Sequence, residues 1–181
     1  MIAGVIVACE IGFWVLVGLG LATRYVLRRR RAGLVLLALT PLVDVVLLVA
    51  TALDLRAGAT ANPFHGLAAL YLGFSVAYGH KLIQWADVRF AHRFAGGPAP
   101  VRLHGGAYTR ECWHNVRRTA TGVLVAAAAL WFLTVLVGDP ERTSDLEARY
   151  PLLAIIFVVD LIWATSYTVW PRKPRRLAET G

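Results

Sequence analysis

The chain has 181 residues, of which 57% are hydrophobic and only 17% are charged, and its mean hydropathy is +0.58. These values exclude a water-soluble globule and are typical of a protein embedded in a bilayer. The 19 Lys and Arg residues exceed the 11 Asp and Glu residues, giving a net charge of +8; we attribute the excess to the positive-inside bias of membrane proteins and expect no nucleic-acid partner.

Five segments are apolar enough to cross a bilayer, whose hydrocarbon core takes about 20 helical residues. In chain order they cover about 2–23, 33–53, 64–87, 119–138 and 151–170. Turn residues such as Asn62-Pro63 and Gly138-Asp139-Pro140 separate them. We therefore predict an all-α fold in which residues 1–181 form a single membrane domain, a bundle of five transmembrane helices with a basic loop at 88–118.

The orientation follows from the Lys and Arg residues, which gather in three connections. Residues 24–31 carry five, 81–118 carry seven and 172–176 carry four, which is 16 of the 19 in the chain. Short segments rich in Lys and Arg stay on the cytoplasmic side of the membrane. The three basic connections share that side only if the N-terminus lies outside and the C-terminus inside, so we predict an N-out/C-in arrangement with a cytoplasmic 88–118 loop.

Three carboxylic acids lie within the predicted spans: Glu10, Asp44 and Asp160. Each costs roughly 2.5–3.5 kcal/mol at a helix centre on insertion scales, so each requires compensation. We predict that Asp44, Asp160 and Glu10, assisted by His80, bind a proton or a cation. Two structural alternatives stay open: a protonated Asp44 hydrogen-bonded to a neighbouring helix, and a His80 that only satisfies the packing.

Other polar side chains follow the two aspartates at helical spacing. The sets are Thr40, Asp44 and Thr51 on the second segment, and Asp160, Trp163 and Tyr167 on the fifth. Steps of three, four and seven place such residues on one helix face, and Pro41 predicts a kink beside Asp44. The first set forms a supporting polar stripe; the second is either a proton wire ending at Tyr167 or a packed face.

No motif in the chain indicates catalysis or a bound cofactor. There is no Gly-x-Ser-x-Gly, His-Glu-x-x-His or P-loop, so no catalytic residue is assigned. The histidines provide no intramembrane pair for haem, and the loop histidines with Cys112 lack zinc spacing, so no metal is assigned either. Cys9 lies in the first span and Cys112 in the basic loop, and we expect no bridge between them.

The end of the third segment mixes basic and aromatic residues. Trp85, Arg89 and Arg93 suit the headgroup layer, where guanidinium groups meet lipid phosphates. We therefore expect contacts with the lipid bilayer and with anionic headgroups.

Residues 40–100 resemble the central part of the YmcC-like family of small bacterial integral membrane proteins. The matching pieces are Pro41 with Asp44, Phe64-His65-Gly66, Gln84-Trp85-Ala86-Asp87 and Arg93-Phe94-Ala95-Gly96-Gly97. The resemblance implies a bacterial plasma (inner) membrane protein, and it supplies no substrate, cofactor or catalytic residue.

Two functions remain in view. The first is a proton- or cation-linked transporter or transporter subunit that uses the intramembrane carboxylates. Because five helices enclose little space, we expect a homodimer or a membrane partner protein to complete its pathway. The alternative is a non-transporting scaffold or accessory protein that binds a partner or anionic lipid through its basic loop.

Overall fold

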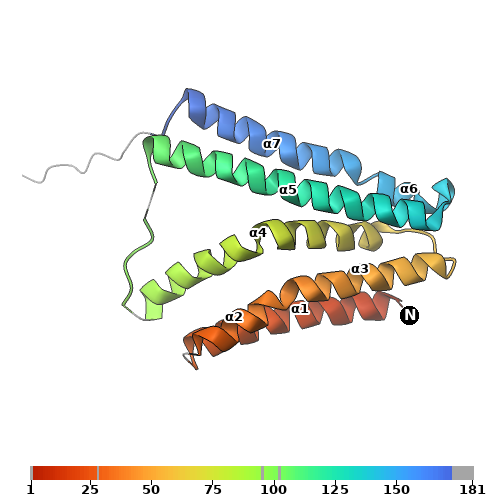
Figure 1. Cartoon of the computed structure of the whole chain (residues 1–181), viewed down its shortest axis with the longest axis horizontal. Helices are drawn as coiled ribbons and strands as arrows, with labels where there is room; N and C mark the ends of the chain where they lie inside the picture. Colours follow the sequence, from red (N-terminus) through yellow and green to blue (C-terminus); the bar gives the residue numbers. More distant parts are fainter. Residues whose placement is uncertain (1, 28, 95, 102, 173–181) are drawn as a thin grey trace, which may run out of the picture.

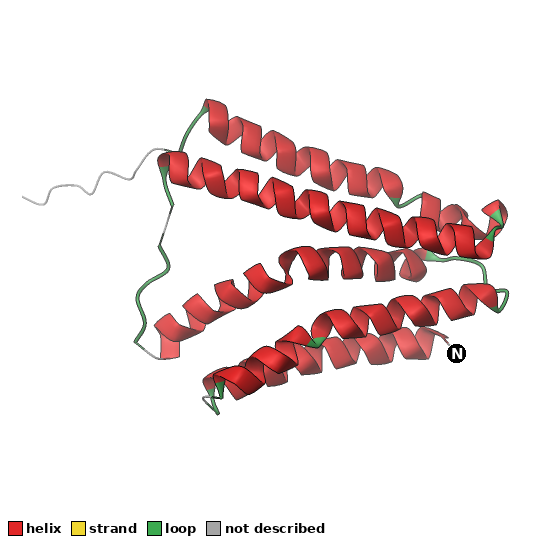
Figure 2. Ribbon diagram, viewed as in Figure 1, coloured by secondary structure: helices red, strands yellow, loops and turns green. Residues whose placement is uncertain are grey.

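The computed structural model describes residues 2–27, 29–94, 96–101 and 103–172; the side chains of Glu10, Thr40 and Pro41 also lie outside the described set. Every regular element in these ranges is a helix (Figure 2). The helices are α1 (Ile2–Tyr25), α2 (Arg30–Ala38), α3 (Thr40–Arg56), α4 (Pro63–Phe94), α5 (Gly105–Val137), α6 (Pro140–Glu147) and α7 (Tyr150–Val169).

The long helices run back and forth along the long axis of an elongated bundle (Figure 1). The α1–α2 connection, the α4–α5 connection and the end of α7 lie at one end, which we call the basic end. The α3–α4 connection and α6 lie at the opposite end, which we call the acidic end (Figure 1). The described parts of the three basic connections predicted from the sequence therefore lie at one end of the molecule.

The second predicted segment is interrupted where Pro41 predicts a kink. The helix divides at Leu39, which caps α2 and also precedes α3, and Pro41 occupies the first turn of α3. Proline is tolerated in a first turn, because the N–H that it lacks has no intrahelical partner there. The two pieces stay close to collinear (Figure 1).

Helix α5 begins well before the apolar segment that marks it in the sequence. It starts at Gly105 and α4 continues to Phe94, so only residues 95–104 of the 88–118 loop separate the two helices. Hydropathy detects the part of a helix that suits hydrocarbon, whereas a polar helix end continues into the headgroups or water. At about 1.5 Å per residue, α5 is about 50 Å long and exceeds the bilayer core by about 20 Å.

The acidic end is closed by the short helix α6. Gly138, in the left-handed conformation at φ 65°, ends α5. Asp139 then caps α6 by accepting hydrogen bonds from the backbone N–H groups of Glu141 and Arg142. The Arg142 guanidinium donates to the carbonyl groups of Leu55 and Ala59, and so ties α6 to the end of α3.

The apolar core joins helices α3 to α7 in the half of the bundle nearer the acidic end. Its fully buried members are Leu55, Ala69, Ala126, Leu130, Leu133, Leu146 and Leu153. Helices α4 and α5 approach most closely at small residues: a Cβ on Gly73 would lie 2.8 Å from the Cβ of Ala126, and it would also meet the Gly122 carbonyl. Small residues of this kind permit close helix crossings in membranes.

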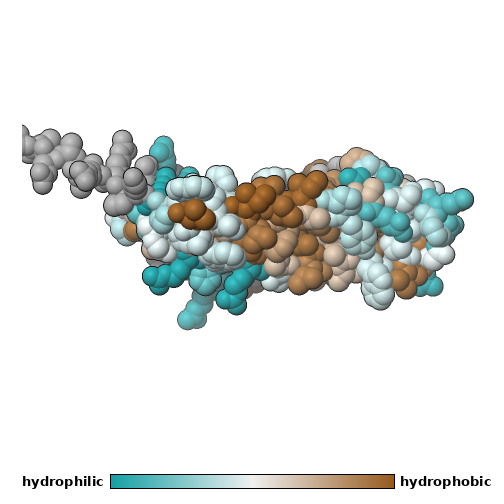
Figure 3. All heavy atoms as spheres, turned by 90° about the horizontal axis from the view of Figure 1, so that it is seen from above, coloured by the Kyte–Doolittle hydropathy of each residue, from teal (hydrophilic) through white to brown (hydrophobic). Residues whose placement is uncertain are grey.

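The outer surface agrees with a membrane location. Figure 3 shows a hydrophobic band between two more hydrophilic ends. In the described part of the chain, three helical stretches are long and apolar enough to cross a membrane: Arg31–Arg56, Gly105–Val137 and Pro140–Val169. Helix α1 adds a shorter apolar stretch, Ile11–Tyr25. Helix α4 is not among the three, so its crossing, and with it the five-span arrangement, stays a prediction.

Candidate functional site

The carboxyl group of Asp160 lies between α7 and α5. The Thr119 hydroxyl of α5 donates a hydrogen bond of 2.6 Å to Asp160 Oδ2, and the Thr119 side chain is 2% exposed. Since no ion pair of Asp160 occurs among the described residues, a hydroxyl group and not a cation faces this carboxyl group.

A third helix joins the same group of hydrogen bonds. The Tyr78 hydroxyl of α4 lies 2.5 Å from Thr119 Oγ1. Thr119 has a single hydroxyl proton and directs it to Asp160, so Tyr78 is the donor when Asp160 is ionised. Asp160, Thr119 and Tyr78 thus form a continuous hydrogen-bonded series across α7, α5 and α4, which we call the hydroxyl series.

A charged cluster continues the hydroxyl series towards the basic end. Tyr78 also lies 3.5 Å from the Asn115 carbonyl, and the Asn115 side chain accepts a hydrogen bond from Lys81. Lys81 donates to Glu111 at 2.8 Å. Arg118 lies 3.4 Å from both Glu111 and Asn115. Lys81, Glu111 and Arg118 are each about one-third exposed, so this cluster connects the interior to the surface.

Asp44 occupies a separate position, at the interface of α3 and α4. It is 4% exposed, and its hydrogen-bonding neighbour is Ser75 of α4. Its Oδ2 atom is buried without a hydrogen-bond partner among the described residues. Thr51 lies two turns further along the same face of α3 and is 1% exposed, and its Oγ1 has no hydrogen-bond partner among the described residues. Helix α4 lies between α3 and α5 (Figure 1), so it separates Asp44 from Asp160.

The other residues predicted for the site lie elsewhere. His80 is exposed and pairs with Gln84, one turn further along α4, at 2.9 Å. The Tyr167 ring packs against Tyr108 and Trp163 with ring centroids 4.8 and 5.5 Å apart, which favours a packed face over a wire. The side chains of Glu10 and Thr40 lie outside the described residues.

The predicted interface residues lie near the basic end of α4. The Arg89 guanidinium stacks over the Trp85 ring at 4.3 Å from its centroid, and both side chains are exposed, as is Arg93. Nearby, Asp87 accepts hydrogen bonds from Arg24 and Tyr25 of α1. This ion pair anchors α1 to α4 just below the exposed basic and aromatic surface.

Sequence reasoning missed the α5 side of the site. It assigned residues 88–118 to a loop and therefore did not examine them for helical spacing. Read as a helix, Glu111, Asn115, Arg118 and Thr119 follow steps of four, three and one, the pattern of a single polar face. The polar spacing is present in the sequence, but it was not recognised because residues 88–118 were assigned to a loop.

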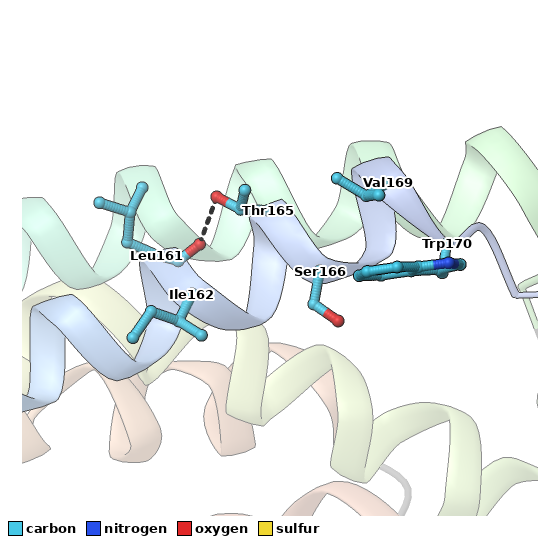
Figure 4. A pocket seen from close by; sticks show the side chains of 6 residues that line it. All are labelled: Leu161, Ile162, Thr165, Ser166, Val169 and Trp170. Atoms are coloured by element: carbon cyan, nitrogen blue, oxygen red, sulfur yellow. Dashed lines mark hydrogen bonds between the residues drawn. The ribbon is translucent and has the colours of Figure 1, made fainter.

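A surface depression on α7 does not belong to this site. It measures about 340 Å³ and is formed by α7 and the residue that caps it. Figure 4 shows its lining: Leu161, Ile162, Thr165, Ser166, Val169 and Trp170. It contains no ionisable group, and the Thr165 hydroxyl bonds to the Leu161 carbonyl of its own helix. We interpret it as part of the lipid-facing surface of α7. Among the described residues no three His, Cys, Asp or Glu side chains are grouped to hold a metal ion.

The apolar helices and the internal carboxyl groups define an all-α membrane protein. Comparison with known proteins gives its family. The chain is 40% identical over 178 residues to a Bacillus subtilis protein described as "uncharacterized membrane protein YmcC", and the match covers 98% of this chain and 96% of that protein. The chain therefore belongs to the YmcC family of membrane proteins, and the resemblance seen in residues 40–100 extends over nearly its whole length. No family model and no solved structure matches it.

Proposed function

We propose that this protein is a small multi-pass transporter of the bacterial plasma membrane, or a subunit of one, that passes protons through intramembrane carboxyl groups. Its proton-binding residues are Asp160 and Asp44, and its N-terminus lies outside the cell. The observation that supports this proposal most directly is the hydroxyl series, in which Asp160 is joined to α4 through Thr119 and Tyr78.

The chemistry of hydroxyl groups suits this task. A hydroxyl donates to an ionised carboxylate and accepts from a protonated one, so Thr119 can stabilise both states of Asp160. A proton can then arrive or leave while the helices keep their packing. The cluster of Lys81 and Glu111 lies beyond Tyr78 in the direction of the basic end, and its partly exposed side chains reach water there.

Proton flux into liposomes tests the proposal. The purified full-length protein is reconstituted with a pH-sensitive dye inside the vesicles, and a potassium diffusion potential drives proton entry. We expect flux that is lost in Asp160→Asn and lowered in Thr119→Val, whereas Thr119→Ser, which keeps the hydroxyl, retains it. Thr165→Val is the matched control, because the Thr165 hydroxyl serves only its own helix.

Unchanged flux in a folded Asp160→Asn variant would contradict the proposal. The proposal would also be contradicted if the unmodified protein carried no ion at all, when the entry of protons, monovalent cations and divalent cations is measured in turn.

A non-transporting scaffold is the second candidate. It is favoured by the fact that Asp160, Thr119 and Tyr78 satisfy one another across three helices, which is also what a purely cohesive arrangement needs. In that case Asp160→Asn and Thr119→Val lower stability and no variant moves protons. The exposed Trp85, Arg89 and Arg93 surface would then dock a partner or anionic lipid.

A further inference from the structure

A second line of polar groups approaches Asp44 from the acidic end of the bundle. Asp54, Thr51 and Asp44 lie on one face of α3 at steps of three and seven residues. The Asp54 side chain is 29% exposed, whereas Thr51 and Asp44 are buried. The line therefore begins at the surface and ends inside the bundle.

The first turn of α4 provides a buried histidine beside Asp54. His65 is 1% exposed, and its Nδ1 accepts a hydrogen bond of 3.1 Å from the backbone N–H of Asn62. In the neutral ring the proton is therefore on Nε2. That atom lies 3.4 Å from Asp54 Oδ2 and makes no hydrogen bond among the described residues, so His65 lies beside the carboxylate at the mouth of the line.

Three atoms on or beside the line are buried and have no hydrogen-bond partner among the described residues: His65 Nε2, Thr51 Oγ1 and Asp44 Oδ2. Buried polar atoms in folded proteins are nearly always satisfied, and ordered water satisfies those that the protein does not. Thr51 and Asp44 lie seven residues apart, or about 10 Å along the helix, a distance that a chain of a few water molecules would span.

We infer that the α3–α4 interface contains a water-filled access route from the acidic end to Asp44, with Asp54 as the proton-exchange group at its mouth. The inference deepens the proposed function and rests on it. A proton from bulk water binds the Asp54 carboxylate, moves through water and the Thr51 hydroxyl, and binds the Asp44 carboxylate. Asp54 is then ionised again, and His65 acts as its positioning residue.

The surroundings of Asp54 favour a proton over a metal cation. Arg149, at the start of α7, packs over Gly66 next to His65. Arg142 of α6 donates to the neighbouring Leu55 and Ala59 carbonyls, and Arg56 is exposed on α3 itself. A small metal ion at Asp54 would find one carboxylate ligand and cationic side chains on the neighbouring elements, whereas a proton needs a single carboxylate.

Helix α4 connects this route with the hydroxyl series. Ser75, the neighbour of Asp44, precedes Tyr78, the neighbour of Thr119, by three residues, so the two lie close together on one helix. The access route and the hydroxyl series thus approach each other at the middle of α4.

Cysteine labelling tests the route without reference to transport. Single cysteines are introduced into the full-length chain after Cys9→Ser and Cys112→Ala, and a charged, membrane-impermeant thiol reagent is applied from each side of the membrane. Thr60→Cys, exposed in the α3–α4 connection, shows which side reaches the acidic end. Leu55→Cys, fully buried in the apolar core at a similar depth, is the control for a position that water does not reach.

From the side that labels Thr60→Cys, we expect Thr51→Cys to react at least about ten-fold faster than Leu55→Cys, because a thiol reacts only where the reagent and water reach it. A Thr51→Cys no faster than Leu55→Cys would overturn the inference.

Proton flux in liposomes tests the role of Asp54. We expect Asp54→Asn to lower the flux at least about ten-fold, as for the loss of a proton-transfer group, and Asp54→Glu to retain it. Arg56→Gln is the neighbouring control. His65→Leu shifts the external pH of half-maximal flux, whereas a purely structural residue would lower the flux equally at every pH.

The two proposals fail in different ways. Rapid labelling of Thr51→Cys in a protein without proton flux overturns the proposed function and supports the access route. Flux in a protein whose position 51 is unreactive, or whose Asp54→Asn variant is fully active, supports the proposed function and overturns the access route.

Discussion

The close approach of α4 and α5 leads to a prediction about a glycine outside the hydroxyl series. A Cβ on Gly73 would lie 2.8 Å from the Ala126 Cβ and 2.9 Å from the Ala126 backbone nitrogen, and it would also meet the Gly122 carbonyl. Carbon atoms in contact normally lie about 3.5–4.0 Å apart, so Gly73→Ala must separate the two helices by about 1 Å.

That separation has an energetic and a functional effect. Overpacking of a filled interface typically costs about 1–3 kcal/mol, and we expect Gly73→Ala to fall in that range. Because Tyr78 and Thr119 face each other across the same two helices at 2.5 Å, a shift of about 1 Å lengthens their contact beyond hydrogen-bonding range. Gly73→Ala therefore lowers proton flux although it adds only one methyl group.

The assay is reversible unfolding in mixed micelles of detergent and SDS, followed by circular dichroism. Gly79→Ala is the matched control, because it lies on the same helix and its Cβ would meet nothing within 4 Å. In the middle of a helix this control is neutral or stabilising by up to about 1 kcal/mol. If Gly73→Ala proved as stable and as active as Gly79→Ala, the packing argument would be refuted.

Three further variants test contacts at the two ends of the bundle. Lys81→Met removes one cation from the partly exposed cluster with Glu111. Since exposed ion pairs contribute little, we expect the free energy of unfolding to fall by less than about 1 kcal/mol in the same assay. A fall several times larger would contradict this. Arg142→Ala removes the donors to the α3 carbonyl groups and should raise hydrogen exchange in α6 while α7 stays protected; equal exchange in both proteins would show that α6 is held by other contacts. Asp139→Ala removes the cap of α6 and should cost about 1 kcal/mol, whereas Asp139→Asn keeps most of that stability; equal losses in the two variants would argue against the cap.

The helical and membrane character of the chain could be predicted from sequence because both depend on local features. Hydropathy identifies apolar helices, and Pro41 marked the division near Leu39. The end of α4 and the start of α5 could not be predicted, since Phe94 and Gly105 lie in polar sequence where hydropathy carries no signal. Helix α6 was missed for the same reason, although Asp139 and Pro140 together form a recognisable helix start.

The partners of the carboxyl groups could not be deduced from single spans. Spacing along one helix shows which residues share a face but not which face meets which helix. Asp44 meets Ser75, and Asp160 meets Thr119 on α5, a helix whose polar face was concealed by the loop assignment. His80 was chosen because imidazole titrates near neutrality. Its neighbour Lys81, however, is the α4 residue that contacts the charged cluster with Glu111.

The placement of Ser75 and Tyr78 one turn apart on α4 has a thermodynamic consequence. Each residue contacts the surroundings of a different carboxyl group, so any displacement of α4 changes both environments at once. Such coupling is reciprocal. If protonation of Asp44 changes the proton affinity of Asp160 by some factor, protonation of Asp160 changes the proton affinity of Asp44 by the same factor. In the proposed transporter, α4 is therefore the element through which the two acids would be coupled, equally in both directions.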